Sequence, residues 1–290
     1  MTEGIIVKVS SGIYTVSHPG GKTNCRPRGK FRIDGTAPIA GDKCKLSFAD
    51  DGAGVITEIL PRKNSLIRPK LANIDNLLIV FAAKNPEPQP GVIDRLTVTA
   101  EQKGIRPIIV ITKADIADGD EIAKYRDIYE SAGYKVIVTS KDDEEDTDEL
   151  LREDLHGKIT AVAGCSGVGK STLINKMFGI DNLRTGEISA KNLKGRHTTT
   201  CIELFEKFDG FVADTPGFSS LEIFEAEKED LENLFPEIKS RLGGCRFNGC
   251  SHITEPDCPI KEAVEKGNIH PLRYESYVKL YTDLKNRKKY

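Results

Sequence analysis

The segment 164–171 in the middle of the chain has the residue types and spacing of a phosphate-binding loop. Its sequence fits G-x-x-x-x-G-K-S at every position, and its glycines would let backbone N–H groups surround phosphate oxygens. Lys170 would supply a cation to the β- and γ-phosphates, and the Ser171 hydroxyl would bind Mg²⁺. A strand is predicted before the loop at 159–163 and a helix after it at 171–178. The predicted nucleotide contacts in this loop are Gly164, Cys165, Ser166, Gly167, Val168, Gly169, Lys170, Ser171 and Thr172.

Two further motifs close predicted strands and indicate a guanine nucleotide. Residues 112–115 (T-K-A-D) resemble N-K-x-D, with Thr112 in place of the usual Asn. The Asp115 carboxylate can accept hydrogen bonds from N1–H and the 2-amino group of guanine, and adenine presents neither donor on that edge. Residues 214–217 (D-T-P-G) match the D-x-x-G of GTPases. The predicted contacts are Thr112, Lys113 and Asp115 in the guanine motif, Ser140 after the next strand through its backbone, Gly217, and Asp214, which would hold Mg²⁺ through water.

The order of these motifs along the chain is unusual. In Ras-like proteins the phosphate loop comes first, whereas here 112–115 precede the phosphate loop and 214–217 come last. The same sheet can be built from a chain that is cut elsewhere, so the order predicts a circularly permuted GTPase with GTP or GDP and Mg²⁺ as cofactors. The segment after Asp214 then runs directly into the C-terminal region, which a rearrangement at the γ-phosphate could move.

The stretch 195–200 (G-R-H-T-T-T) lies between the phosphate loop and Asp214. Thr198 or Thr199 is predicted to bind Mg²⁺ when the γ-phosphate is present, and the sequence leaves the choice open. Phe218 stands where Ras has the glutamine that orients the attacking water, so unaided hydrolysis is expected to be slow, on the order of 10⁻⁴ per second. His197 is the predicted catalytic residue that positions this water. The alternative for His197 is an exposed or phosphate-contacting loop histidine.

A cluster of metal-binding residue types lies near the C-terminus, with the spacing C-x₄-C-x-H-x₅-C. Three thiolates and one imidazole make a closed tetrahedral set, which predicts one structural Zn²⁺ and leaves no open position for chemistry. The alternative is four unpaired reactive or buried side chains. Metal binding would supply much of the folding energy of a small domain. The predicted ligands are Cys245, Cys250, His252 and Cys258, and the other cysteines, Cys25, Cys44, Cys165 and Cys201, are predicted to be ordinary thiols.

The pattern along the chain predicts a multidomain protein. Short alternating strands with regular turn signals over 1–65 predict an OB-type β-barrel, although an SH3-like barrel would look similar. Apolar strands at 77–83, 107–112, 134–140 and 159–164, with helices at 92–103 and 121–132, predict an α/β GTPase domain over 66–221. A hairpin is predicted at 201–214 with its turn at 209–210. Residues 222–290 are predicted to form a mostly helical zinc-binding domain, with helices at 225–234 and 274–288.

Charge is distributed unevenly along the 290 residues. The net charge is −2, but residues 1–70 hold twelve Lys or Arg against six Asp or Glu. Residues 26–32 (R-P-R-G-K-F-R) place four cations beside one aromatic, which suits single-stranded or looped RNA, and 285–290 form a second basic run. Solvated charge is the alternative for both. Duplex DNA is disfavoured because no reading helix is evident.

The longest apolar run, at 77–83, is about a third of the length that a membrane span needs. The N-terminal residues also lack the cationic and apolar regions of a signal peptide. We therefore expect a cytoplasmic protein with no membrane association, and we expect it to be a monomer. The odd number of cysteines, seven, favours thiols or metal ligands over disulfides.

The order of small barrel, permuted GTPase and Cys₃His domain resembles the RsgA (YjeQ) family of bacterial ribosome-small-subunit-dependent GTPases. The resemblance covers essentially the whole chain and rests on residues 112–115, 164–171, 196–200 and 214–217 and on the Cys–His cluster. It implies a role in late maturation of the small ribosomal subunit. It also implies contacts with rRNA and GTP hydrolysis that the small subunit stimulates.

Other functions remain possible at the level of sequence. The main prediction is a GTPase whose slow hydrolysis times its release from an RNA particle. An RNA-binding scaffold gated by GTP or GDP would show little turnover even with ribosomal particles. A permuted GTPase of the large subunit shares the central domain but does not explain the barrel and the zinc domain. A metal-dependent nuclease is disfavoured because Asp214 is the only carboxylate with a clear role at Mg²⁺.

Overall fold

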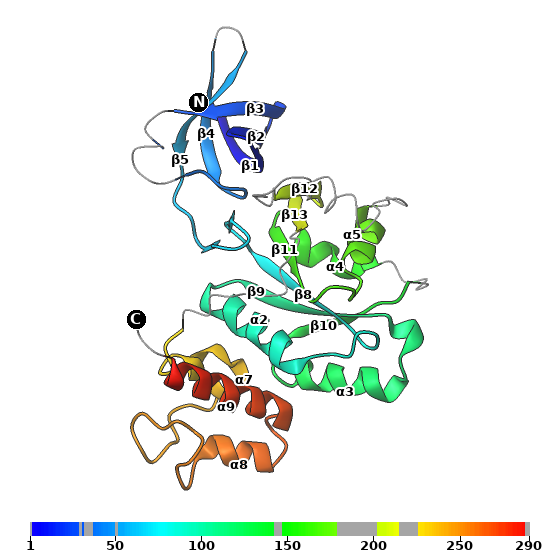
Figure 1. Cartoon of the computed structure of the whole chain (residues 1–290), viewed down its shortest axis with the longest axis vertical. Coiled ribbons are helices and arrows are strands. Elements are labelled where there is room, and N and C mark those ends of the chain that lie inside the picture. The colour runs from blue at the N-terminus through cyan, green and yellow to red at the C-terminus, as the bar shows by residue number, and fades with distance from the viewer. Residues whose placement is uncertain are drawn as a thin grey trace. The chain divides into compact units, whose positions relative to one another are not determined.

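The computed structural model describes residues 2–28, 31, 37–49, 52–141, 147–178, 202–214 and 226–287. The chain divides into two compact units. The first contains Met1–Leu77, Glu145–Val162 and Lys170–Phe218, and the second contains Leu78–Glu144, Ala163–Gly169 and Ser219–Tyr290. The division passes through strands β8 (Asn76–Ala82) and β11 (Ile159–Ala163), so each unit holds part of the α/β core (Figure 1).

The first unit begins with a barrel of five strands, drawn in blue in Figure 1. Its strand order is β1-β2-β3-β5-β4, and β1 closes the barrel by pairing with β4. β3 and β5 are parallel, whereas the other pairs are antiparallel. This closed order confirms the OB-type prediction over the SH3-like alternative. The strands are β1 (Thr2–Ser10), β2 (Ile13–His18), β3 (Gly21–Pro27), β4 (Lys43–Phe48) and β5 (Gly54–Ile59).

Strand alternation places one row of barrel side chains inside and the other in solvent. The two thiols Cys25 and Cys44 are among the buried residues. Burial raises the pKa of both thiols, and for Cys44 the pKa reaches about 12 with Cys25 and Asp42 adding to the effect. These are the properties of ordinary core thiols, as the sequence predicted. The buried core of the barrel consists of Ile6, Tyr14, Val16, Cys25, Cys44, Leu46 and Ile56.

Polar contacts fasten the segment after the barrel, which carries the short strands β6 (Ser65–Leu66) and β7 (Leu71–Ala72). The buried Asp42 carboxylate accepts hydrogen bonds from Arg62 Nε at 2.6 Å and from Nη2 at 2.8 Å. Asn73 Nδ2 donates to the carbonyl oxygen of Gly41 at 2.9 Å. Asp75 then accepts from the backbone N–H of Ile159 at 2.9 Å. These contacts join the barrel to β11 through a continuous set of hydrogen bonds within the first unit.

The rest of the first unit contains α4 (Thr147–Leu155), α5 (Lys170–Phe178), β12 (Glu203–Lys207) and β13 (Gly210–Asp214). β13 is parallel to β11 and antiparallel to β12. Lys207 pairs with Gly210, so the hairpin turns at 208–209, one residue before the predicted turn at 209–210. Both turn residues have positive φ, 52° and 56°, as a two-residue type I′ turn requires. β12 also pairs with β1 at Lys8 and Glu203, whose side chains form an ion pair at 2.7 Å.

The second unit contains β8, β9 (Arg106–Thr112) and β10 (Lys135–Val138), of which β9 and β10 are parallel. The predicted strands and helices of this region are confirmed, with shifted ends. α2 (Pro90–Gln102) starts two residues before its prediction because Pro90 suits the first helical position. α3 (Gly119–Glu130) starts early because Asp118 and Glu121 form a capping box. A single 3₁₀ turn, η1 (Ala114–Ile116), follows β9.

The C-terminal part of the second unit contains η2 (Leu231–Leu234), α7 (Pro236–Lys239), α8 (Pro259–Glu265) and α9 (Pro271–Asn286). The helix predicted over 225–234 is wrong for the described residues, because 226–230 are not helical and η2 is a 3₁₀ turn. Pro236 disfavours helical angles at Phe235, which is extended, and starts a new helix. The last predicted helix is confirmed but begins at Pro271. No helix in the described part of the chain has the length and apolarity to cross a membrane.

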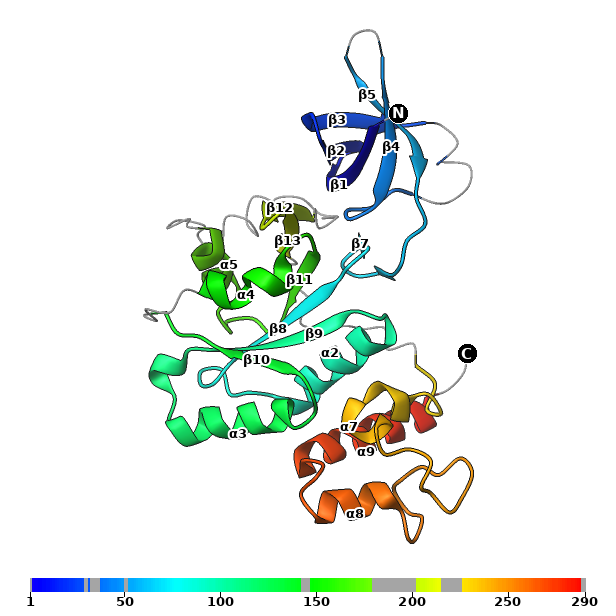
Figure 2. The same cartoon turned by 180° about the vertical axis from the view of Figure 1, so that it is seen from behind.

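Arg273 on α9 joins the C-terminal helices to α2. Its Nη1 donates to Asp94 of α2 at 2.6 Å, and its Nε donates to Glu237 of α7 at 2.7 Å. All three side chains are buried, and the guanidinium lies 4.6 Å from the ring centroid of Phe235. Burial raises the pKa of Asp94, while the charge of Arg273 opposes that rise. α7 and α9 lie beside α2 in both views (Figures 1 and 2).

Replacing Arg273 with Met should lower the free energy of unfolding by about 3–5 kcal/mol, because two buried carboxylates lose their cation. Urea denaturation followed by circular dichroism would measure the change. The matched control is Arg126→Met, which removes an exposed i,i+4 pair with Glu130 and should change stability by less than about 0.5 kcal/mol. Equal stability of the two variants would contradict the structural role of Arg273.

Candidate functional site

The predicted phosphate loop connects β11 to α5. Its first glycine, Gly164, has φ of 148°, and a Cβ there would lie 2.0 Å from the carbonyl oxygen of Val80. No other residue type fits this position, since real Cβ contacts are never so short. Gly169 at the end of the loop has φ of 94°, also a conformation that side-chain-bearing residues rarely adopt. The backbone therefore has the shape that the G-x-x-x-x-G-K-S pattern predicts.

Thr112 fixes the guanine motif to this loop. Its buried hydroxyl donates to the carbonyl oxygen of Val168 at 2.5 Å and lies 3.2 Å from the carbonyl oxygen of Phe81. The Thr112 carbonyl accepts from the N–H of Ala83 at 2.9 Å. The Thr112 hydroxyl thus links the guanine motif directly to the phosphate loop.

The other residues of the guanine motif come directly after Thr112 in the chain. Lys113 has a left-handed backbone, φ 59°, and its Nζ donates to the carbonyl oxygen of Asn85. Asp115 lies in η1 and its side chain is exposed, as a carboxylate that must meet a ligand should be. The N–H of Ala114 bonds to the carbonyl oxygen of Thr139, which places the start of η1 beside the segment of Ser140. The second unit thus brings 112–115, Ser140 and the phosphate loop together at the strand ends.

The predicted Mg²⁺ residues lie in the first unit. Lys170, Ser171 and Thr172 form the first turn of α5. Asp214 is the last residue of β13. Ala161 of β11 pairs with Ala213 of β13, so the two parallel strands end at the same edge, where β11 leads into the phosphate loop. His197, Thr198, Thr199 and Gly217 lie outside the described residues.

A cavity of about 140 Å³ lies beside the phosphate loop within the second unit. It is too small for a whole nucleotide, since ligand pockets measure roughly 300–1,000 Å³. One face of α2 forms part of its wall, while Asp94 on the same helix binds Arg273. α2 therefore contacts both the loop region and the C-terminal helices. The cavity is lined by residues including Phe81, Val92, Ile93, Leu96, Cys165 and Val168.

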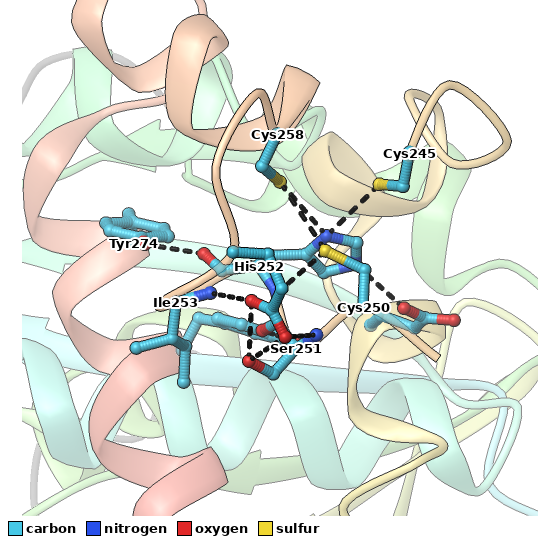
Figure 3. A network of polar contacts seen from close by, with 10 residues as sticks. Cys245, Cys250, Ser251, His252, Ile253, Cys258 and Tyr274 are labelled. Carbon is cyan, nitrogen blue, oxygen red and sulfur yellow. Dashed lines mark hydrogen bonds and ion pairs between the residues drawn. The ribbon is translucent and has the colours of Figure 1, made fainter. Parts of the chain in front are cut away.

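The predicted metal ligands are gathered at one point (Figure 3). One ligand atom from each of Cys245, Cys250, His252 and Cys258 lies within 4.8 Å of the others. His252 Nδ1 is 3.5 Å from the sulfur of Cys245 and 3.4 Å from that of Cys258, and the sulfurs of Cys250 and Cys258 are 3.9 Å apart. Zn–S bonds of about 2.3 Å in a tetrahedron put sulfurs about 3.8 Å apart. The donor set and its spacing therefore fit Zn²⁺.

The electrostatics of the cluster also favour a cation. Burial, and after it the neighbouring Cys258, raise the pKa of Cys245 to about 12, and burial raises the pKa of Cys250. Packed thiols cannot all ionise together unless a metal ion compensates their charge. The four residues of the cluster provide a complete tetrahedral set of ligand atoms. Such a set fits a structural ion better than a catalytic one.

Side chains around the cluster hold the ligands in place. Glu232 Oε2 lies 2.8 Å from His252 Nε2, which leaves Nδ1 free to face the sulfurs. Such a carboxylate orients a metal-binding imidazole and fixes its tautomer. The Glu255 carboxylate accepts from the N–H and hydroxyl of Ser251 at 2.8 Å. Tyr274 on α9 donates to the carbonyl oxygen of His252 at 2.6 Å (Figure 3).

The structure describes part of the predicted RNA-contacting segment of the barrel. Arg26 and Arg28 are exposed, as an RNA-contacting segment requires. Phe31 is partly buried and packs against the barrel core, and its role as an aromatic platform stays a prediction. Gly29, Lys30 and Arg32 lie outside the described residues.

Known families account for most of the chain. Residues 59–224 match the family model of the RsgA GTPase, and residues 3–56 match that of the RsgA N-terminal domain. The small ribosomal subunit biogenesis GTPase RsgA 1 of Listeria monocytogenes is 43% identical over 291 residues, with 99% of both chains covered. The chain belongs to the RsgA GTPase family.

Other members of the RsgA family are equally similar. The small ribosomal subunit biogenesis GTPase RsgA of Geobacillus kaustophilus is 44% identical, again over 99% of both chains. The crystal structure of YjeQ from Thermotoga maritima matches with a TM-score of 0.83 at 39% identity and covers 99% of each chain. YloQ, described as a circularly permuted GTPase, matches with a TM-score of 0.83 at 38% identity, over 100% of this chain and 97% of that one.

Membership of the RsgA family makes the chain a GTPase, whose cofactors include a guanine nucleotide and Mg²⁺. It also confirms the permuted fold, because YjeQ and YloQ superimpose over nearly the whole chain. The sequence did not reveal Glu232 or Asn85 as supporting residues. Neither belongs to a motif, and each is distant in sequence from the residue it holds, His252 and Lys113 respectively.

Replacing Thr112 with Val should weaken binding of a fluorescent GDP analogue about tenfold, which corresponds to about 1.4 kcal/mol. Val has nearly the same shape but cannot donate to the Val168 carbonyl, so the phosphate loop loses its link to the guanine motif. Thr112→Ser keeps the hydroxyl and should bind like the wild type. Equal affinities for the Val and Ser variants would show that the hydrogen bond does not matter for the nucleotide.

Replacing Glu232 with Ala should lower zinc affinity about 10- to 100-fold, because His252 loses the carboxylate that orients it. Competition with a chromogenic chelator would measure the affinity. Glu229→Ala is the control, since Glu229 is an exposed carboxylate close in sequence that pairs with Lys228 instead. If both variants hold zinc as tightly as the wild type, Glu232 does not support the metal site.

Proposed function

We propose that this chain hydrolyses GTP to GDP and phosphate as an assembly factor in late maturation of the small ribosomal subunit. The observation that carries the proposal is similarity over 99% of the chain to proteins named small ribosomal subunit biogenesis GTPase. The similarity includes the barrel and the Cys–His region as well as the GTPase core. A partner that needs all three parts would preserve such full-length similarity.

The nucleotide would be held by the motifs at the strand ends. Residues 164–172 would surround the phosphates, with Lys170 at the β- and γ-phosphates. Ser171 and Asp214 would bind Mg²⁺, joined by Thr198 or Thr199 in the GTP state, with Gly217 at the γ-phosphate. Lys113 and Asp115 would contact the guanine base, with Ser140 at its oxygen. The Thr112 hydrogen bond to Val168 supports this assignment, because it ties the base-binding and phosphate-binding segments together.

Three domains would divide these tasks: an RNA-binding barrel at 1–65, the permuted GTPase at 66–221 and a zinc domain at 222–290. The family matches at 3–56 and 59–224 support the first two boundaries. The spacing of the four ligand atoms supports one structural Zn²⁺ in the third. The barrel's exposed Arg26 and Arg28 support contacts with rRNA. We further propose that the protein is cytoplasmic and monomeric and binds neither membranes nor duplex DNA.

Hydrolysis would depend on the partner. Phe218 cannot orient the attacking water, so the free protein would turn over slowly and the small subunit would accelerate the reaction. Sedimentation through sucrose tests the binding half of this proposal. The chain should co-sediment with small subunits in the presence of a non-hydrolysable GTP analogue and be released with GDP. Co-sedimentation that does not depend on the nucleotide would contradict a GTP-driven cycle.

The His197→Ala variant tests the proposed catalytic residue. It should lower GTP hydrolysis in the presence of small subunits by about 10²- to 10⁴-fold, the range of positioned proton-transfer groups. Affinity for a GTP analogue should change by less than about threefold, since the contact forms only when water attacks. A parallel loss of nucleotide affinity would instead indicate a phosphate-contacting histidine.

A further inference from the structure

Phe48 is the exposed aromatic ring of the barrel. Among the barrel's Phe and Tyr residues, Tyr14 is buried and Phe31 packs on the core, whereas Phe48 is 48% exposed. It is the last residue of β4, opposite Gly54 of β5, so no cross-strand side chain covers it there. A single exposed ring is common on proteins. What distinguishes this one is the ring beside it.

His18 stands against Phe48 in a fixed orientation. The two ring centroids are 5.6 Å apart and the planes meet at 62°, an edge-to-face arrangement. The N–H of Gly20 donates to His18 Nδ1 at 3.1 Å, so the ring hydrogen is on Nε2, which lies 2.9 Å from Thr23 Oγ1 and can donate to it. Both ring nitrogens are therefore occupied, and the imidazole cannot rotate without breaking two hydrogen bonds.

Gly20 makes room for this arrangement. A Cβ at this position would lie 3.0 Å from His18 Cε1 and 3.2 Å from Nδ1. The absence of a side chain lets the imidazole lie under the turn between β2 and β3. The pair of rings is thus built into the barrel by the turn and by Thr23, and it does not depend on a flexible side chain. A preformed aromatic surface binds a ligand with little loss of conformational entropy.

Both rings lie at the same end of the barrel. β1 runs between β2 and β4, and the start of β1 pairs with Leu46 on one side and Ser17 on the other. His18 and Phe48 end these two strands on either side of β1, and Phe48 is 48% exposed there. Lys22 pairs with Ser17 at this end, and its Nζ is 3.9 Å from Glu206, with half of its side chain exposed.

The charge of the N-terminal segment as a whole favours a polyanion over a neutral partner. Residues 1–70 carry twelve Lys or Arg against six Asp or Glu. Exposed aromatic rings on a basic barrel are the combination that binds single-stranded nucleic acid, because every base has a π-face and every nucleotide a phosphate. Bases in duplex RNA are already stacked and paired, so they cannot reach such a platform.

We propose that Phe48 and His18 form a stacking site for an unpaired RNA base, with Phe48 against the face of the base and His18 holding the Phe48 ring. This inference rests on the proposed RNA-binding function of the barrel and assigns an aromatic contact to this end of the barrel. Stacking of one base on an aromatic side chain changes affinity by roughly 5- to 150-fold. The site is tolerant of base identity, because stacking needs only a π-face.

The sequence contains no tryptophan, which allows a direct test. The full-length Phe48→Trp variant carries a single indole at the site, and addition of a ten-nucleotide oligouridine should quench its fluorescence as the base stacks. Ile13→Trp is the matched control, because Ile13 is 44% exposed and lies at the opposite end of β2. Its fluorescence should stay constant. Quenching of both indoles, or of neither while RNA binds, would overturn the proposal.

Fluorescence anisotropy with the labelled oligouridine and with an RNA duplex of equal length tests the stacking site separately from RNA binding by the barrel. Phe48→Ala should weaken oligouridine binding at least about fivefold and leave duplex binding unchanged, whereas Ile13→Ala should change neither. Unchanged oligouridine binding by Phe48→Ala would overturn the stacking site while leaving the RNA-binding barrel intact. A wild-type chain that binds no RNA would overturn the RNA-binding function and the stacking site together. Circular dichroism melting would confirm that each variant is folded.

Discussion

The hydroxyl of Thr112 lies where three distant parts of the chain meet. It donates to Val168, 56 residues away in the phosphate loop, and lies near the carbonyl oxygen of Phe81, 31 residues away on β8. In a permuted chain the guanine motif comes before the phosphate loop, so covalent order does not bring the two together. In the folded chain the hydrogen bond from Thr112 to Val168 joins the guanine motif to the phosphate loop. The Thr112 side chain thus holds the guanine motif and the phosphate loop next to each other.

Helix α2 contacts both the region of the phosphate loop and the C-terminal helices. One face of α2 lines the cavity beside the phosphate loop, and Asp94 on the same helix binds the buried Arg273. Glu237 and the ring of Phe235 complete the surroundings of the guanidinium. A buried cation between two carboxylates tolerates little displacement, because each unpaired charge would be costly. The position of the C-terminal helices is therefore tied to a helix that also borders the phosphate loop.

Local signals in the sequence predicted the fold and the chemical motifs well. Glycines at fixed spacing, apolar strands that end in polar residues and the C-x₄-C-x-H-x₅-C pattern all act over short distances. Contacts that depend on tertiary structure were not predictable. Glu232 reaches His252 from 20 residues upstream, and Asp94 meets Arg273 across 179 residues. The predicted helix over 225–234 was wrong, since Pro236 disfavours helical angles at the residue before it and a new helix begins there.

We propose that the small ribosomal subunit triggers GTP hydrolysis by a slow, permuted GTPase. The most direct measurement is the rate of GTP hydrolysis by the wild-type chain alone, with small subunits, with large subunits and with free RNA. We expect the rate to rise at least about a hundredfold with small subunits and to change little with the other additions. A rate that stays flat with small subunits would instead favour a nucleotide-gated RNA-binding scaffold.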